Sequence, residues 1–216
     1  RLTDGKVHLS ARYGNEGYMS EVKGVEYHTF SGKHPAGNVG VQIHHIDRIA
    51  KGDIVWTVNI QDVAMIGRSV LAGKVDMSKT IAVAGTKAPK CGYKRIISGA
   101  AVESIVGKVG ADTRVISGDV LSGVQTATDG YISANAHALT LIPGGDVYEL
   151  LGWAMPRFHR FSVSRAYFSW LCPKKEYNLD TNLNGGERPF VVTGLYENYL
   201  PMDSYVSYLL KACLVK

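Results

Sequence analysis

The chain has 216 residues, a formal net charge of +5 at pH 7, 45% hydrophobic residues and 20% charged residues. These values are typical of an ordinary folded protein and exclude a disordered chain. No apolar run approaches the ~18 residues that a membrane-spanning helix needs, and no basic stripe interleaved with aromatic residues indicates nucleic-acid binding.

Two short apolar segments, residues 7–11 and 25–30, open the first part of the chain. Residues 54–59 and 80–84 have the pattern of buried strands, and residues 61–73 place apolar side chains at helical spacing before Gly73. Alternating strands and helices favour a parallel α/β sheet. We therefore predict a Rossmann-like parallel α/β layer over residues 1–88.

The segment after Pro89 and Gly92 contains shorter elements and many glycine turns. The predicted strands are residues 94–98, 113–117 and 138–142, with a brief helix over residues 101–106. Several strands around one small helix indicate a compact α+β module of roughly fifty residues. We expect a β-grasp of the soluble-ligand-binding type over residues 89–145.

The remaining residues, 146–216, are predicted to form a C-terminal α+β part. The boundary is marked by the turn-forming sequence Pro143-Gly144-Gly145, and Asn184-Gly185-Gly186 predicts a further turn. Pro201 is expected to open a final helix with an apolar face. Clusters of Lys and Arg, such as residues 157–165, are expected on solvated faces.

Three cysteines, Cys91, Cys172 and Cys213, lie far apart, which predicts a reducing compartment and no disulfide framework. The chain begins with Arg1 rather than methionine and has no signal-like apolar region. It also ends directly after a helical pattern. We therefore expect it to be part of a longer protein.

Residues 31–47 form the most unusual stretch, because glycines, a proline and three histidines gather between two predicted strands. One interpretation is a tight strand-to-helix connection in which Pro35 opens the helix and Gly37 and Gly40 permit close packing on the sheet. The other is a helix start whose backbone N–H groups face an anion or a polar head group. The residues alone leave both interpretations open.

The sequence contains no constellation of catalytic residues. A metal site from His34, His44, His45 and Asp47 is disfavoured because adjacent histidines point to different faces of a helix. There is no G-x-S-x-G elbow, no G-x-G-x-x-G after a strand and no C-x-x-C pair, so hydrolase, dinucleotide and iron–sulfur sites are not expected. We predict no catalytic residue and no tightly bound flavin, cluster or metal.

Several segments in the same order resemble the A subunit of the sodium-translocating NADH:quinone oxidoreductase, the bacterial respiratory sodium pump. Residues 31–47 are similar to S-G-P-H-P-A-G-x-V-G-x-x-I-H-x-x-D, with Lys33 in place of a proline. Residues 114–123 resemble R-V-I-S-G-S-V-L-S-G, with Asp119 in place of a serine. The other matching segments are residues 55–67 (V-W-x-x-N-x-Q-D-V-x-x-I-G), 152–165 (G-W-x-x-P, then K-F-S-x-x-R), 182–188 (N-G-x-x-R) and 194–203 (G-x-Y-E, then x-P-M-D).

The resemblance implies the central and C-terminal part of that protein. It implies a peripheral protein on the cytoplasmic face of the bacterial inner membrane, without a membrane span of its own, whose partners are the other pump subunits. The implied function is quinone-linked electron transfer coupled to sodium export, or assembly of the complex. Ubiquinone would be a ligand of the full subunit, while the isolated fragment would be inactive. The alternative is a ligand-binding or scaffolding module without redox chemistry.

The candidate site follows from the unusual stretch and this resemblance. We expect His34, Pro35, Gly37, Gly40 and His44 to shape a helix start at the carboxyl edge of the sheet, where open α/β sheets bind ligands. A histidine can donate to a quinone carbonyl, and free N–H groups at a helix start favour negative charge. A quinone head group or an acidic loop of a partner would dock there.

Overall fold

A computed structural model describes residues 3–15, 17–145, 147–183, 189–191 and 194–215. The chain forms two compact units, one from Arg1–Thr57 with Arg188–Lys216 and the other from Val58–Glu187. The combination of parallel and mixed sheets with helices confirms the predicted α/β and α+β class.

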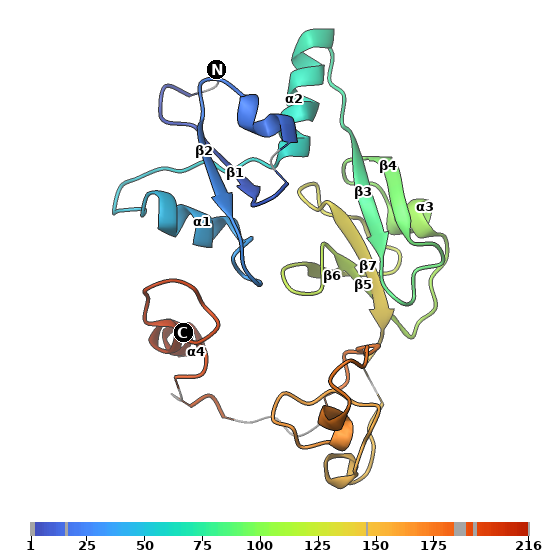
Figure 1. Cartoon of the computed structure of the whole chain (residues 1–216). Coiled ribbons are helices and arrows are strands. Elements are labelled where there is room, and N and C mark those ends of the chain that lie inside the picture. Colours follow the sequence, from blue (N-terminus) through green and yellow to red (C-terminus); the bar gives the residue numbers. More distant parts are fainter. Residues whose placement is uncertain (1–2, 16, 146, 184–188, 192–193, 216) are drawn as a thin grey trace. The chain divides into compact units, whose positions relative to one another are not determined.

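The first unit is built on a parallel ribbon of two strands. Strand β1 (His8–Arg12) pairs along its whole length with β2 (Glu26–Phe30), so that His8 lies opposite Glu26. The 3-10 helix η1 (Gly17–Glu21) lies on the connection between the two strands (Figure 1). Both strands end at the same edge of the ribbon, where the Tyr13 N–H donates to the Phe30 carbonyl at 2.8 Å. Helix α1 (Val39–Ile46) follows this edge, and helix α4 (Val206–Leu214) ends the unit.

Three local predictions for this unit are wrong. The predicted strand over residues 54–59 does not form, because a strand needs a paired neighbour and no described strand pairs with it. Helix α1 begins at Val39 rather than at Pro35, which lies in the preceding turns. Helix α4 begins at Val206 rather than at Pro201.

The second unit begins with helix α2 (Ile60–Ala72), whose ends have well-defined caps. The side chain of Asn59 accepts a hydrogen bond from the Gln61 N–H at 3.0 Å, which satisfies one of the free donors at the helix start. Gly73 ends the helix with φ = 63°, a left-handed conformation that favours glycine. The predicted helix over residues 61–73 is therefore confirmed.

Five strands form the mixed sheet of this unit. Their bounds are β3 (Ser78–Ala84), β4 (Gly92–Ile97), β5 (Thr113–Ser117), β6 (Val124–Thr126) and β7 (Ala138–Pro143). The spatial order is β4-β3-β7-β5-β6, with β3 and β7 parallel at the centre and every other pair antiparallel. With the short helix α3 (Val102–Val106), this is the arrangement of a β-grasp.

The predicted β-grasp therefore forms, but its first strand precedes the predicted start. Residues 80–84 were expected in the parallel layer over residues 1–88, whereas β3 pairs with β4 and β7. The expected boundary between residues 88 and 89 falls inside the β3–β4 hairpin. The three-part division at residues 88 and 145 otherwise stays a prediction.

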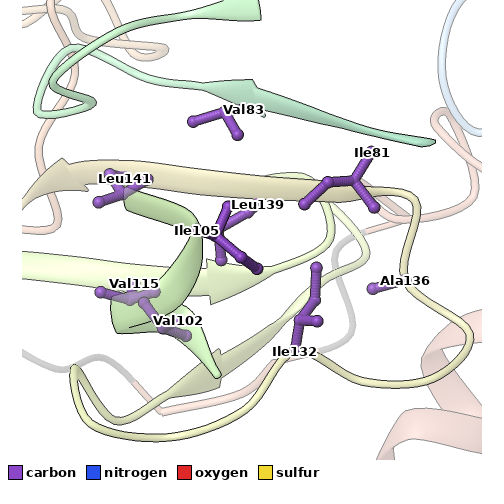
Figure 2. Close-up of a cluster of buried hydrophobic side chains, with 9 residues drawn as sticks. All are labelled: Ile81, Val83, Val102, Ile105, Val115, Ile132, Ala136, Leu139 and Leu141. Carbon is purple, nitrogen blue, oxygen red and sulfur yellow. The ribbon is translucent and has the colours of Figure 1, made fainter. Parts of the chain in front are cut away.

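The core of the β-grasp lies between helix α3 and the sheet (Figure 2). The buried side chains come from β3, β5, β7, α3 and the segment before β7, and they are Ile81, Val83, Val102, Ile105, Val115, Ile132, Ala136, Leu139 and Leu141. Burying a side chain of this size contributes about 1.5–3 kcal/mol relative to leaving it exposed. This cluster is the hydrophobic core of the unit.

Residues 147–183 continue the second unit with two 3-10 helices, η2 (Gly152–Ala154) and η3 (Phe168–Leu171). Arg160 Nη1 donates to Asp180 Oδ2 at 2.6 Å, and Arg157 pairs with Glu149. The bond to Asp180 raises the pKa of Arg160. These two arginines are thus engaged in ion pairs rather than simply solvated, and the predicted turn at residues 184–186 lies outside the described residues.

Candidate functional site

The predicted site residues lie at the carboxyl edge of the β1–β2 ribbon and on helix α1. Residues 33–38 form two consecutive turns, in which the Ala36 N–H donates to the Lys33 carbonyl at 2.9 Å and the Asn38 N–H donates to the Pro35 carbonyl at 2.8 Å. His34 is exposed in these turns, and Pro35 is half-buried. The turns therefore present His34 to solvent directly before the helix.

Gly37 and Gly40 are open to solvent. Neither the backbone conformation nor the packing of the described chain requires glycine at these positions. A Cβ atom added at either residue meets no described atom within 4 Å, and neither has a left-handed φ. Close packing on the ribbon therefore does not explain why these two residues are glycine. Their absent side chains leave the backbone at the start of α1 accessible.

The start of α1 is not capped by a side chain. Asn38 occupies the N-cap position without a side-chain hydrogen bond, and its carbonyl accepts from the N–H groups of Val41 and Gln42. The first N–H groups of a helix lack acceptors within the helix, and the helix dipole favours negative charge beside them. Val41 is buried and fixes this end of the helix, so the start of α1 can receive an anion or a polar oxygen.

His44 lies one helical turn after Gly40 on the same face, about 6 Å along the helix axis. Its ring meets the ring of His45 edge to face, with centroids 5.4 Å apart. His45 Nε2 donates to the Pro201 carbonyl at 2.7 Å, which attaches the segment before α4 to α1. The structure thus gathers His34, Pro35, Gly37 and Gly40 at the helix start and places His44 at the opposite end of the same helix.

Several nearby groups set the protonation of His44. Removal from water, the Arg48 guanidinium and the His45 ring lower its pKa below the ordinary 6.5, while the Asp203 carboxylate opposes them. Together these groups favour the neutral imidazole.

We expect that Asp203→Asn lowers the pKa of His44 further and that Arg48→Ala raises it, because each change removes one of these charges. A proton NMR titration of the His44 ring measures both shifts, with Asp129→Asn in the other unit as a control. An unchanged His44 titration in Asp203→Asn would show that the segment before α4 does not lie against α1 in solution.

Two further clusters of titratable side chains were missed by the sequence analysis. In the second unit, His137 Nε2 lies 3.5 Å from Asp62 Oδ2, and the buried Lys79 donates to the Ala134 carbonyl. Burial lowers the pKa of both Lys79 and His137, and Asp62 opposes this effect. This cluster ties α2 to the sheet.

The second cluster lies on the β1–β2 ribbon, where His8, Glu26 and His28 bring three potential ligand atoms together. Glu26 and His28 are two residues apart, a spacing that puts both on one face of a strand. That spacing was visible in the sequence, whereas the approach of His8 depends on the pairing of β1 with β2.

Comparisons with known proteins agree along the chain. Residues 1–75 match the family model described as the NqrA second alpha/beta domain, and residues 80–128 match the SLBB model described as the NQRA C-terminal domain. Over 100% of this chain, the A subunits of the Na(+)-translocating NADH-quinone reductases of Rhodopirellula baltica, Alcanivorax borkumensis and a serogroup C Neisseria meningitidis are 37%, 38% and 35% identical.

The chain belongs to the NqrA family. It spans 48–49% of the length of the three curated relatives. The resemblance that residues 31–47 and the other segments predicted is therefore confirmed.

The NqrA family models agree with the observed elements. The first model covers β1, β2, α1 and α2, and the second covers most of the β-grasp from β3 to β6. Within the described residues, no helix is both long enough and apolar enough to span a membrane.

Proposed function

We propose that this chain is a peripheral part of a sodium-translocating NADH:quinone reductase, on the cytoplasmic face of the membrane, that contributes to quinone-linked electron transfer coupled to sodium export or to assembly of the complex. The observation that carries this proposal is the similarity to NqrA proteins over the whole chain. The other subunits of the pump would be its partners.

Ubiquinone is the ligand we propose for the full subunit, with its head group at the start of α1. Three features support this position: the exposed imidazole of His34, the uncapped helix start, and the open backbone at Gly37 and Gly40. A quinone carbonyl accepts hydrogen bonds, and a helix start favours the negative charge that develops on its reduction. Tyr13 is exposed at the same edge and adds an aromatic face.

The chain itself would position the quinone rather than carry electrons. The three cysteines are separate and exposed, and the sequence lacks the motifs that bind a cluster or a dinucleotide. We therefore propose that the chain holds no flavin or iron–sulfur cluster and that the isolated chain is inactive. Electrons would then reach the quinone from cofactors in partner subunits.

A scaffolding role without redox chemistry is the second candidate function. It is favoured by the segment after α1, where Ile54 is 82% exposed and Trp56 is 89% exposed. Apolar side chains this exposed are typical of surfaces that another protein covers. In this role the chain would hold neighbouring subunits without contacting the quinone.

The two functions can be separated by His34→Gln and His44→Gln in the full pump. If α1 binds the head group, loss of the His34 hydrogen bond should raise the KM for ubiquinone by about 2- to 10-fold, since such a bond contributes about 0.5–1.5 kcal/mol. The amount of assembled pump should not change. Quinone-dependent turnover and subunit recovery after purification measure the two effects.

His159→Gln in the second unit is the matched control, because it also removes an exposed imidazole. Reduced assembly at unchanged KM would support the scaffolding role instead. Unchanged KM and unchanged assembly in both histidine variants would contradict a role for these side chains.

A further inference from the structure

Three donor side chains converge on one face of the β1–β2 ribbon. The register places His8 opposite Glu26 and Ser10 opposite His28, so that His8, Glu26 and His28 project from the same face. Each offers one ligand atom, and these three atoms all lie within 4.8 Å of one another. Paired residues of β1 and β2 lie 18 positions apart in the sequence, and the two strands together build one cluster of nitrogen and oxygen donors.

The distances match those between the ligands of a single ion. His8 Nδ1 lies 3.0 Å from His28 Nε2 and 3.4 Å from Glu26 Oε2. A tetrahedral Zn²⁺ with bonds of about 2.0–2.1 Å holds neighbouring ligand atoms about 3.3 Å apart. An ion would fit among these atoms with small side-chain movements.

The surroundings suit an ion that exchanges with solvent. Both imidazoles are half-buried and Glu26 is exposed, so solvent reaches the cluster from the carboxylate side. Three protein ligands leave a fourth position for water, and imidazole with carboxylate is a donor set that suits Zn²⁺.

We propose that His8, Glu26 and His28 form an exchangeable site for a divalent transition metal, with Zn²⁺ as the matching ion. The sequence predicted no tightly held metal, and a three-ligand site open to solvent does not conflict with that prediction because its ion would exchange with solvent.

The structural role follows from the size of the ribbon. A two-stranded sheet is marginally stable by itself, and the ion would join β1 to β2 toward the start of both strands, away from the carboxyl edge that leads to His34. Metal binding to the folded state alone stabilises it in proportion to the logarithm of metal concentration. The site would therefore stabilise the first unit without taking part in redox chemistry.

Lys6 would compete with a metal ion for the carboxylate of Glu26. Its Nζ lies 3.3 Å from Glu26 Oε1, and the pair is exposed, with relative side-chain accessibilities of 73% and 50%. Exposed pairs of this kind contribute little to stability, so an ion can displace the lysine. Removing the Lys6 charge should then favour metal binding.

Titration of the 216-residue chain with Zn²⁺ alone, followed by calorimetry and by thermal unfolding, tests the proposal. We expect one bound Zn²⁺ per chain and a higher Tm with Zn²⁺. His28→Gln and Glu26→Gln should each weaken binding by at least about 10-fold, because even the loss of an outer partner of a ligand costs that much. Lys6→Ala should tighten binding, and His159→Gln should leave it unchanged.

Circular dichroism verifies that each variant is folded, and Glu26→Gln, at an exposed position, retains the shape of the side chain. Equal Zn²⁺ affinity in the wild type, His28→Gln and Glu26→Gln would overturn the proposal. The absence of a Zn²⁺-dependent rise in Tm in the wild type would also overturn it.

Discussion

Gly85→Ala is expected to lower the free energy of unfolding of the β-grasp by about 3 kcal/mol or more, because backbone strain and overpacking each cost about 1–3 kcal/mol. Gly85 follows β3 with φ = 103°, and a Cβ atom there would lie 2.0 Å from the Leu141 carbonyl oxygen on β7. Neither the Gly85 backbone nor the Leu141 backbone can move away from this Cβ atom without separating β3 from β7.

Native-state hydrogen exchange of the β3 and β7 amides measures this effect. Protection should fall by about 100-fold, since each 1.4 kcal/mol is a factor of ten. Gly67→Ala is the matched control, because Gly67 lies inside α2 with open space around it. That change should stabilise the helix by about 0.5–1 kcal/mol. Unchanged protection in Gly85→Ala would contradict the observed approach of β3 to β7.

Leu139→Ala should destabilise the same unit by about 2–5 kcal/mol, the range found when a buried leucine is truncated. Leu139 is fully buried on the central strand β7, between Val83 of β3 and Ser117 of β5. Truncation leaves a cavity that the sheet on one side and α3 on the other cannot easily fill.

Urea unfolding followed by circular dichroism measures the change. Leu121→Ala is the control, because Leu121 is 66% exposed and such surface changes usually stay within about 0.5 kcal/mol. Similar unfolding midpoints for Leu139→Ala and Leu121→Ala would show that the β-grasp core is not packed as described.

The elements with strong local signals were predictable from the sequence. Helix α2 has apolar residues at helical spacing and Gly73 at its end, and it forms within one residue of the predicted bounds. The buried strand β5 forms at its predicted residues because a short apolar run between turns specifies a strand locally. The family resemblance was likewise readable from separate motifs in the correct order.

Two of the failures share a physical cause, which is dependence on partners far away in the sequence. Residues 54–59 have the composition of a buried strand, but strand formation needs a paired neighbour that local sequence cannot specify. The sequence also assigned β3 to the wrong layer, because its pairing with β7 joins residues more than fifty positions apart. The role of Pro35 was misjudged because a proline is equally suited to a turn and to a first helical residue.

The candidate site was only partly predictable for the same reason. The position of residues 31–38 at the carboxyl edge follows from strand and helix order alone. By contrast, the contact of His45 with Pro201 and the cluster of His8 with Glu26 and His28 depend on tertiary pairing. Those contacts could be found only once the strands and the C-terminal segment were in place.

The most direct test of the proposed quinone site is photoaffinity labelling of the full pump with a photoreactive ubiquinone analogue, followed by peptide mapping. The start of α1 is the site we propose, so we predict labelling of Tyr13 or of residues 34–44, and unmodified ubiquinone should suppress it by competition. Competable labelling that falls only outside the first unit of this chain, in residues 58–187 or in partner subunits, would contradict a quinone site at the start of α1.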